Sequence, residues 1–252
     1  MLRSLTIAAL LLALTGCSDS SSDPDVAGGR SPEALTDADL DRFLSVVHRH
    51  EGAKIPEFTP PDEDQMLDMN SSATELVASF QEQCRQLFDA ERQGKVWARD
   101  TDWAQALKGS GTAPTRFAML VRDVSLAIMR VRLEARVDLG RLVAQARRQV
   151  EQTVRTMEEI DENPAAERTS EASTLRARSV IRLGQAVALL EFAERVRQVP
   201  PESAAVVRRY SRQLKPLLPP GANDELLAEL KKLATAPEGA VQPAEYEEPA
   251  GK

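Results

Sequence analysis

Aromatic residues are scarce in this chain of 252 residues. Phe, Trp and Tyr account for only 4% of the sequence, whereas hydrophobic residues as a whole reach 42%. Because strands are normally rich in aromatic and β-branched side chains, a core filled by Leu, Val and Ala favours helices packed on helices. We therefore predict an all-α fold.

The shortage of histidine limits the chemistry that the chain offers. His48 and His50 are the only histidines, which leaves little material for histidine-based acid–base catalysis. They stand two residues apart, with Glu51 beside them, whereas a zinc-binding helix motif places its histidines four apart on one face. The sequence predicts no metal site, no cofactor and no catalytic constellation, so an enzyme is the less favoured class of protein.

Cysteine and long apolar runs are scarce as well. Cys17 and Cys84 are the only cysteines, and Cys84 stands among apolar residues at helical spacing, which predicts a buried thiol. The most apolar stretch covers residues 5–14. It is about half as long as a membrane-spanning helix, but it suits the apolar region of a signal peptide.

The residues that end this run are Leu14-Thr15-Gly16-Cys17, and Arg3 precedes it. This order of positive charge, apolar run, leucine, small residue and cysteine resembles the lipobox signal of bacterial lipoproteins. In that family the cysteine is lipidated on its sulfur, the preceding peptide is removed and the new amino terminus is acylated. The resemblance implies that lipid chains on Cys17 attach the protein to a membrane of the bacterial cell envelope, with the folded part facing the periplasm.

Two plainer interpretations of the same segment are an ordinary cleaved signal with an incidental cysteine and an uncleaved anchor. The resemblance to lipoproteins covers residues 1–17 alone. Ser18 and Asp19 occupy the position of a sorting signal, and they leave the choice between inner and outer membrane open.

Composition divides the chain into four parts. Residues 1–16 form the predicted signal peptide, and residues 17–34 combine the lipidated cysteine with a Ser-, Asp- and Gly-rich tether that we expect to be flexible. Residues 35–234 show the apolar periodicity of a single helical domain. Residues 235–252, rich in proline and glutamate, form a tail that we expect to be disordered.

The longest predicted element covers residues 114–162, which contain no proline beyond Pro114. Its apolar residues recur every three or four positions, as in a coiled coil, which predicts one helix about 70 Å long. A second apolar seam continues to residue 199. Because a short connection makes two long helices antiparallel neighbours, we predict a helical hairpin over residues 114–199.

Shorter helices are predicted on both sides of this hairpin. Local signals place their ends: Thr36 and a Ser72–Glu75 capping box begin helices, and Gly94 ends one. The predicted ranges are 36–51, 72–93, 95–108, 202–214 and 223–234. The longer arm of the hairpin overhangs the shorter one, so the helices before residue 108 are expected to cover the overhang.

Charge is distributed unevenly, within a net charge of −7. Residues 114–212 carry 18 basic residues, all arginine, against 13 acidic ones (+5), whereas residues 18–113 carry 9 basic and 19 acidic ones (−10). Arg132, Arg136 and Arg147 are candidates for a face that binds an anionic partner, such as lipid headgroups, an acidic envelope polymer or another envelope protein. The alternative is a solvated face paired with acidic residues of the same molecule. Nucleic acid is not an expected partner of a secreted acidic protein.

Trp97 and Trp103 are the other candidate site. In one interpretation they form a stacking platform for a glycan or small ligand, with Asp100 and Asp102 as hydrogen-bonding neighbours. In the other, both indoles anchor the core. The sequence favours a lipid-anchored envelope protein whose helical domain binds a partner or acts as a spacer. An envelope enzyme or ligand receptor with a pocket near the tryptophans is the alternative, and the oligomeric state stays open.

Overall fold

The computed structural model describes residues 34–61, 68, 70–162, 170–218 and 230. Within these residues, α-helices and one short 3-10 helix are the only regular secondary structure, which confirms the all-α prediction. The predicted signal peptide, Cys17, nearly all of the tether and the C-terminal tail lie outside the described residues.

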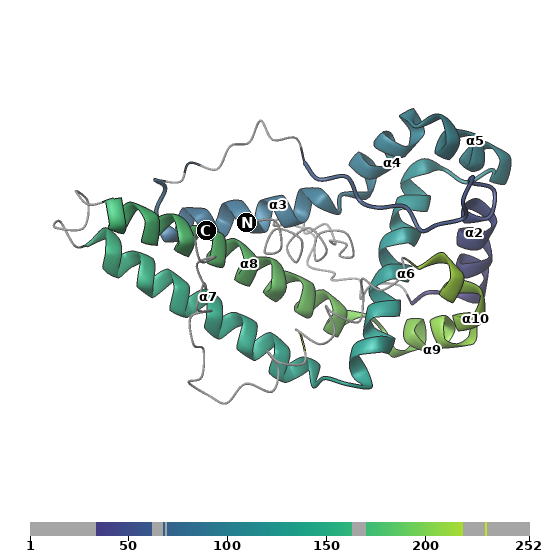
Figure 1. The fold of residues 1–252 in the computed structure, drawn as a ribbon. Coiled ribbons are helices and arrows are strands. Elements are labelled where there is room, and N and C mark those ends of the chain that lie inside the picture. Colours follow the sequence, from purple (N-terminus) through teal and green to yellow (C-terminus); the bar gives the residue numbers. More distant parts are fainter. Residues whose placement is uncertain (1–33, 62–67, 69, 163–169, 219–229, 231–252) are drawn as a thin grey trace, which may run out of the picture.

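The helices form a body and an arm (Figure 1). The body contains α2 (Asp37–Val47), α4 (Ala90–Arg99), α5 (Thr101–Ser110), α6 (Pro114–Glu134), α9 (Pro201–Arg209), α10 (Ser211–Leu214) and η2 (Lys215–Leu217). The arm contains α3 (Ala73–Leu87), α7 (Leu139–Asp161) and α8 (Ser170–Gln198).

Local capping signals set several helix starts as predicted. The Thr36 hydroxyl accepts the backbone N–H of Asp39, whose carboxylate accepts the N–H of Thr36 in return. Ser72 and Glu75 form the same reciprocal pair at the start of α3. Such a capping box satisfies two backbone N–H groups that the helix itself leaves without partners.

The single helix predicted over residues 114–162 is wrong, because the chain turns between α6 and α7. Asp138 caps α7, and its side chain accepts the backbone N–H of Arg141. Val137 next to it is only 8% exposed and belongs to the main core. The helix is therefore interrupted at this point: Val137 packs into the main core, and Asp138 caps a new helix, α7. The hairpin predicted over residues 114–199 is accordingly reduced to α7 and α8.

α7 and α8 run antiparallel, as ion pairs at both ends demonstrate. Arg147 near the start of α7 pairs with Glu194 near the end of α8 at 2.7 Å. Asp161 at the end of α7 pairs with Arg176 near the start of α8, also at 2.7 Å. α3 packs along α8 (Figure 1). A small core joins the three helices and comprises Ala73, Leu76, Met157, Val180, Leu183 and Val187.

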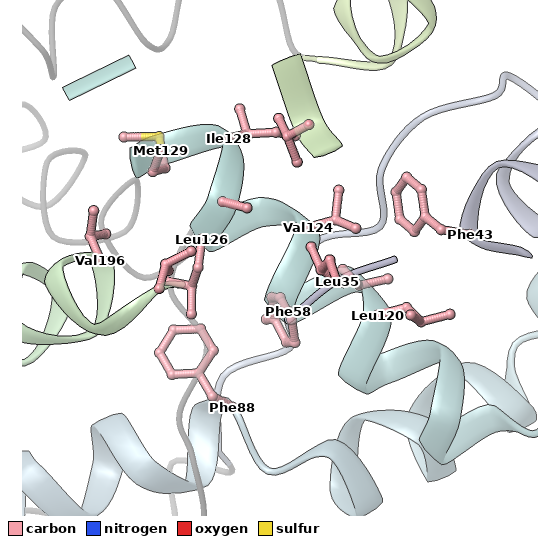
Figure 2. Packing of buried hydrophobic residues seen from close by; sticks show 14 of the residues in the cluster. Leu35, Phe43, Phe58, Phe88, Leu120, Val124, Leu126, Ile128, Met129 and Val196 are labelled. Atoms are coloured by element: carbon pink, nitrogen blue, oxygen red, sulfur yellow. The ribbon is translucent and has the colours of Figure 1, made fainter. Parts of the chain in front are cut away.

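α6 is the central helix of the body, with α2, α4 and α9 packed around it. Every residue from 124 to 129 is buried, so no side of α6 faces solvent there. Figure 2 shows α6 side chains surrounded by those of other segments, among them Leu35, Phe43, Phe58, Phe88 and Val196. The main core therefore forms around α6.

The helix end predicted at Gly94 is also wrong. α3 already ends at Leu87, the Asp89 side chain caps α4, and α4 continues through Gly94. A Cβ atom at this position would lie 2.7 Å from the backbone nitrogen of Thr115 at the start of α6. Glycine is needed here for the close approach of α4 to α6 rather than for a helix end.

Candidate functional site

The arginines proposed as an anionic-partner face occupy different environments. Arg147 pairs with Glu194 across the arm at 2.7 Å. Arg132 is partly buried and Arg136 is exposed, and neither of them lacks a partner. Arg130 donates to the backbone carbonyls of Arg197, at 3.3 Å, and of Val199, at the end of α8. Its guanidinium thus satisfies carbonyl groups that the helix end leaves open.

Other arginines of residues 114–212 also pair with carboxylates of this same chain. Among these pairs are Arg116 with Asp39, Arg195 with Glu191, Arg208 with Glu134, and Arg209 with Asp37. Asp37 and Asp39 belong to the acidic part of the chain before the arm helices α7 and α8. For these arginines the structure supports internal pairing, one of the two alternatives that the sequence leaves open.

The two tryptophans lie in the core of the body. Trp97 is 3% exposed and Trp103 is 8% exposed. Their ring centroids lie 6.3 Å apart, and each ring lies within 5.6 Å of the Phe117 ring. Phe58 contacts Trp97 from another side, at 5.6 Å. The indoles are therefore core anchors, and no stacking platform of exposed indole faces exists at Trp97 and Trp103.

One side chain that covers Trp103 is His50. The imidazole and indole rings are nearly parallel, with an interplanar angle of 16° and centroids 3.9 Å apart. His50 follows α2 in a turn closed by a hydrogen bond from the Ala53 N–H to the His50 carbonyl. Gly52, with φ of 86°, and Ala53, with φ of 40°, give this turn its left-handed backbone. The turn places the imidazole over the start of α5.

Two carboxylates at the start of α5 lie next to this imidazole. Ligand atoms of His50, Asp100 and Asp102 all lie within 4.8 Å of one another. Asp100 is the N-cap of α5, and its Oδ1 accepts the backbone N–H groups of Asp102 and Trp103, both at 3.0 Å. His50 Nδ1 is enclosed and has no hydrogen-bond partner. Among the described residues, this is the group of side chains best suited to hold a metal ion.

Sequence reasoning missed this group because it considered His50 with its chain neighbours, His48 and Glu51. His48 is exposed and does not belong to the group. About fifty positions separate His50 from Asp100, so only the packing of α2 on α5 brings them together. The one local signal is the pair of aspartates around Thr101, and such a pair is common at helix starts without any ligand.

The thiol of Cys84 is buried, as predicted. Burial raises the pKa of this thiol to about 11, while the nearby charges of Arg195 and Glu191 act in opposite directions. A thiol that stays protonated at neutral pH is a poor nucleophile and a poor metal ligand. Cys84 therefore contributes to packing rather than to chemistry.

Comparisons with known proteins assign neither a family nor a function, because no protein-family model, curated protein or solved structure matches this chain. Within the described ranges, no helix combines the length and the apolar character needed to cross a bilayer.

Proposed function

We propose that this chain is a lipid-anchored protein of the bacterial cell envelope whose helical arm binds a partner. The observation that carries the anchoring proposal is the Leu14-Thr15-Gly16-Cys17 motif after an apolar run. Two or more lipid chains give stable membrane attachment without a membrane-spanning helix. The folded part then works at the membrane surface, as a binding module or as a spacer.

The dimensions of the arm support a role in reaching a partner. α7 has 23 residues and α8 has 29, which correspond to about 35 and 43 Å at the usual rise of an α-helix. Both helices extend from the body in the same direction (Figure 1). Such an arm presents its outer surface at a distance from the body, which suits both a spacer and a binding module.

The outer surface of α8 favours binding over mere spacing. Leu175, 46% exposed, and Ile181, 58% exposed, are the large hydrophobic residues most open to solvent in the described structure. Arg178 and Arg182 lie at helical spacing from them, are exposed, and have no ion pair with a described residue. Exposed aliphatic side chains beside unpaired arginines are typical of a surface that binds a partner with negative charge.

The anchoring proposal is tested with Cys17→Ser. We expect the variant to leave the membrane fraction and to lose the label of a radioactive fatty acid. Cys84→Ser is the matched control, because it removes the other cysteine and should leave both properties unchanged. Full membrane retention of Cys17→Ser without lipid label would refute lipid anchoring.

The binding proposal is tested by cross-linking in the native envelope. A photo-reactive amino acid replaces Ile181 on the arm or Gln105, which is exposed on the body. We expect capture of a discrete partner from position 181 and not from position 105, with a yield that falls as salt rises. Arg178→Ala combined with Arg182→Ala should reduce the yield. Equal capture from both positions, independent of salt, would contradict the proposal.

A further inference from the structure

We propose that His50, Asp100 and Asp102 form a binding site for a divalent transition-metal ion, with zinc as the best match. One ligand atom of each residue lies within 4.8 Å of the ligand atoms of the other two. The residues come from two parts of the fold that α2–α5 packing holds together. The site is independent of the arm and of the lipid anchor.

The imidazole is held in place before any ion binds. Its ring stacks on Trp103 at 3.9 Å, and Trp103 is itself fixed against Trp97 and Phe117. A ligand that needs no ordering loses little conformational entropy when it binds. Stacking on a buried indole thus makes His50 a rigid first ligand.

The enclosed nitrogen of His50 is a second observation that points to a ligand. Nδ1 has no hydrogen-bond partner among the described residues, although it is shielded from solvent. An enclosed polar atom without a partner costs free energy, and an ion or water in the native protein is a common reason for it. In this proposal Nδ1 is the ligand atom, because coordination through Nδ1 gives this nitrogen the partner that it lacks, whereas coordination through Nε2 would leave it without one.

The two carboxylates supply charge and oxygen ligands. Asp100 uses Oδ1 to cap α5, which leaves Oδ2 available. The carboxylate of Asp102 is exposed and has no partner within the described part of the chain. The start of a helix carries about half a positive charge, which opposes a cation, but two carboxylates outweigh it. Asp102 can turn toward the imidazole without breaking another contact.

The types of ligand atom, one imidazole nitrogen and two carboxylate oxygens, indicate which class of metal ion would bind. Imidazole with carboxylates suits zinc and its neighbours, whereas magnesium and calcium prefer oxygen ligands alone. Three protein ligands and one water complete a tetrahedral zinc site with bonds of about 2.0–2.2 Å. Ligand atoms around such an ion lie about 3.4 Å apart, so closing the site from within 4.8 Å requires the exposed carboxylate of Asp102 to turn toward the ion while Asp100 keeps its cap.

The test is a zinc titration of the full chain carrying Cys17→Ser, so that buried Cys84 is the only thiol. Calorimetry measures affinity and stoichiometry, and magnesium serves as the comparison ion. His48→Ala is the matched control, since His48 is the other histidine, two residues away and exposed. Asp100→Asn keeps the helix cap, because asparagine caps as well as aspartate does.

We expect one zinc ion per chain with a micromolar Kd and no comparable binding of magnesium. His50→Ala and Asp102→Asn should each raise the Kd at least about tenfold, and Asp100→Asn should raise it too, whereas His48→Ala should leave it within twofold. Circular dichroism checks folding. If His50→Ala is misfolded, the zinc Kd of Asp102→Asn is the deciding measurement, because the Asp102 side chain is exposed and its replacement should leave the fold intact. Absent zinc binding, or equal losses in His48→Ala and His50→Ala, would overturn the proposal.

Discussion

The guanidinium of Arg176 holds the carboxylate of Asp161 through two hydrogen bonds, 2.7 Å from Nε and 3.2 Å from Nη2. Its Nη2 also donates to the backbone carbonyl of Ser71 at 2.8 Å. Asp161 ends α7, Arg176 lies in α8 and Ser71 precedes α3. One side chain therefore connects all three helices at the end of the arm farthest from the body (Figure 1).

Replacing Arg176 by lysine should loosen this end of the arm. Lysine has no planar fork, so it cannot hold Asp161 at two points and Ser71 as well. We expect a loss of about 1–2 kcal/mol in the free energy of unfolding, with faster amide exchange at the starts of α3 and α8. Arg155→Ala on α7, exposed and without an ion pair to a described residue, should stay within about 0.5 kcal/mol. Equal losses in both variants would show that the fork is not important.

Replacing Gly94 by alanine should destabilise the body. The new Cβ would lie 2.7–2.9 Å from backbone atoms of Pro114 and Thr115, which cannot move away as a side chain could. We expect a loss of at least about 2 kcal/mol in denaturant unfolding, since overpacking typically costs 1–3 kcal/mol. Gly109→Ala is the control, because its Cβ would meet only the end of the Arg49 side chain. A stabilised Gly94→Ala would contradict the close helix contact.

The buried amide of Gln93 joins the extended segment after α2 to the end of α3. Gln93 is 0% exposed; its Oε1 accepts the Thr59 N–H at 3.1 Å, and its Nε2 donates to the carbonyls of Thr59 and Leu87. Gln93→Leu keeps the volume but leaves three backbone groups without this partner. We expect a loss of about 2–3 kcal/mol in the free energy of unfolding. Gln86→Leu, which removes an amide whose hydrogen bond goes to the nearby Glu82 side chain rather than to a backbone group, should cost clearly less.

Features decided by a few neighbouring residues were predictable from the sequence. The N-cap at Thr36 and the capping box of Ser72 with Glu75 depend on residues within one helical turn, so the sequence alone reveals them. The break at Asp138 was not predictable in this way. The apolar spacing continues across it, through Leu139 and Leu142, and only the structure shows that Asp138 caps a new helix and that Val137 is buried in the body.

The candidate sites show the same difference between features set by neighbouring residues and features set by packing of distant segments. Cys84 was correctly placed in the core because its apolar neighbours recur at helical spacing. The His50, Asp100 and Asp102 group was missed because its members are joined by packing of α2 on α5 and by stacking on Trp103. Lipidation of Cys17 stays a prediction, since this residue lies outside the described part of the chain.

Acid should weaken the capping box at Asp39. Burial raises the pKa of this carboxyl, but hydrogen bonds from Thr36 and the charge of Arg116 outweigh burial, so the pKa lies below its ordinary value. A folded-state pKa below the unfolded one means that ionised Asp39 stabilises the fold above about pH 4, and that this stability is lost as pH falls through the folded-state pKa.

Asp39→Asn should therefore lower the melting temperature at pH 7 and reduce its fall between about pH 5 and about pH 2. Thermal unfolding followed by circular dichroism across this range measures both effects. Glu159→Gln, which removes a charge from an exposed side chain without a described partner, should leave the pH profile nearly parallel to that of the parent. Parallel profiles for Asp39→Asn as well would contradict the role of the ionised cap.

The thiol of Cys84 should react slowly in the folded protein. Its pKa of about 11 leaves about 0.1% thiolate at pH 8, against about a quarter for an ordinary thiol of pKa about 8.5. In a Cys17→Ser background, we expect alkylation at pH 8 to be at least about 100-fold slower than in denaturant. The raised pKa also means that stability from the neutral thiol is complete below about pH 8.5 and is lost as pH rises toward 11. The native rate should keep rising about tenfold per pH unit up to that value, and a plateau near pH 9 would show that the thiol is not desolvated.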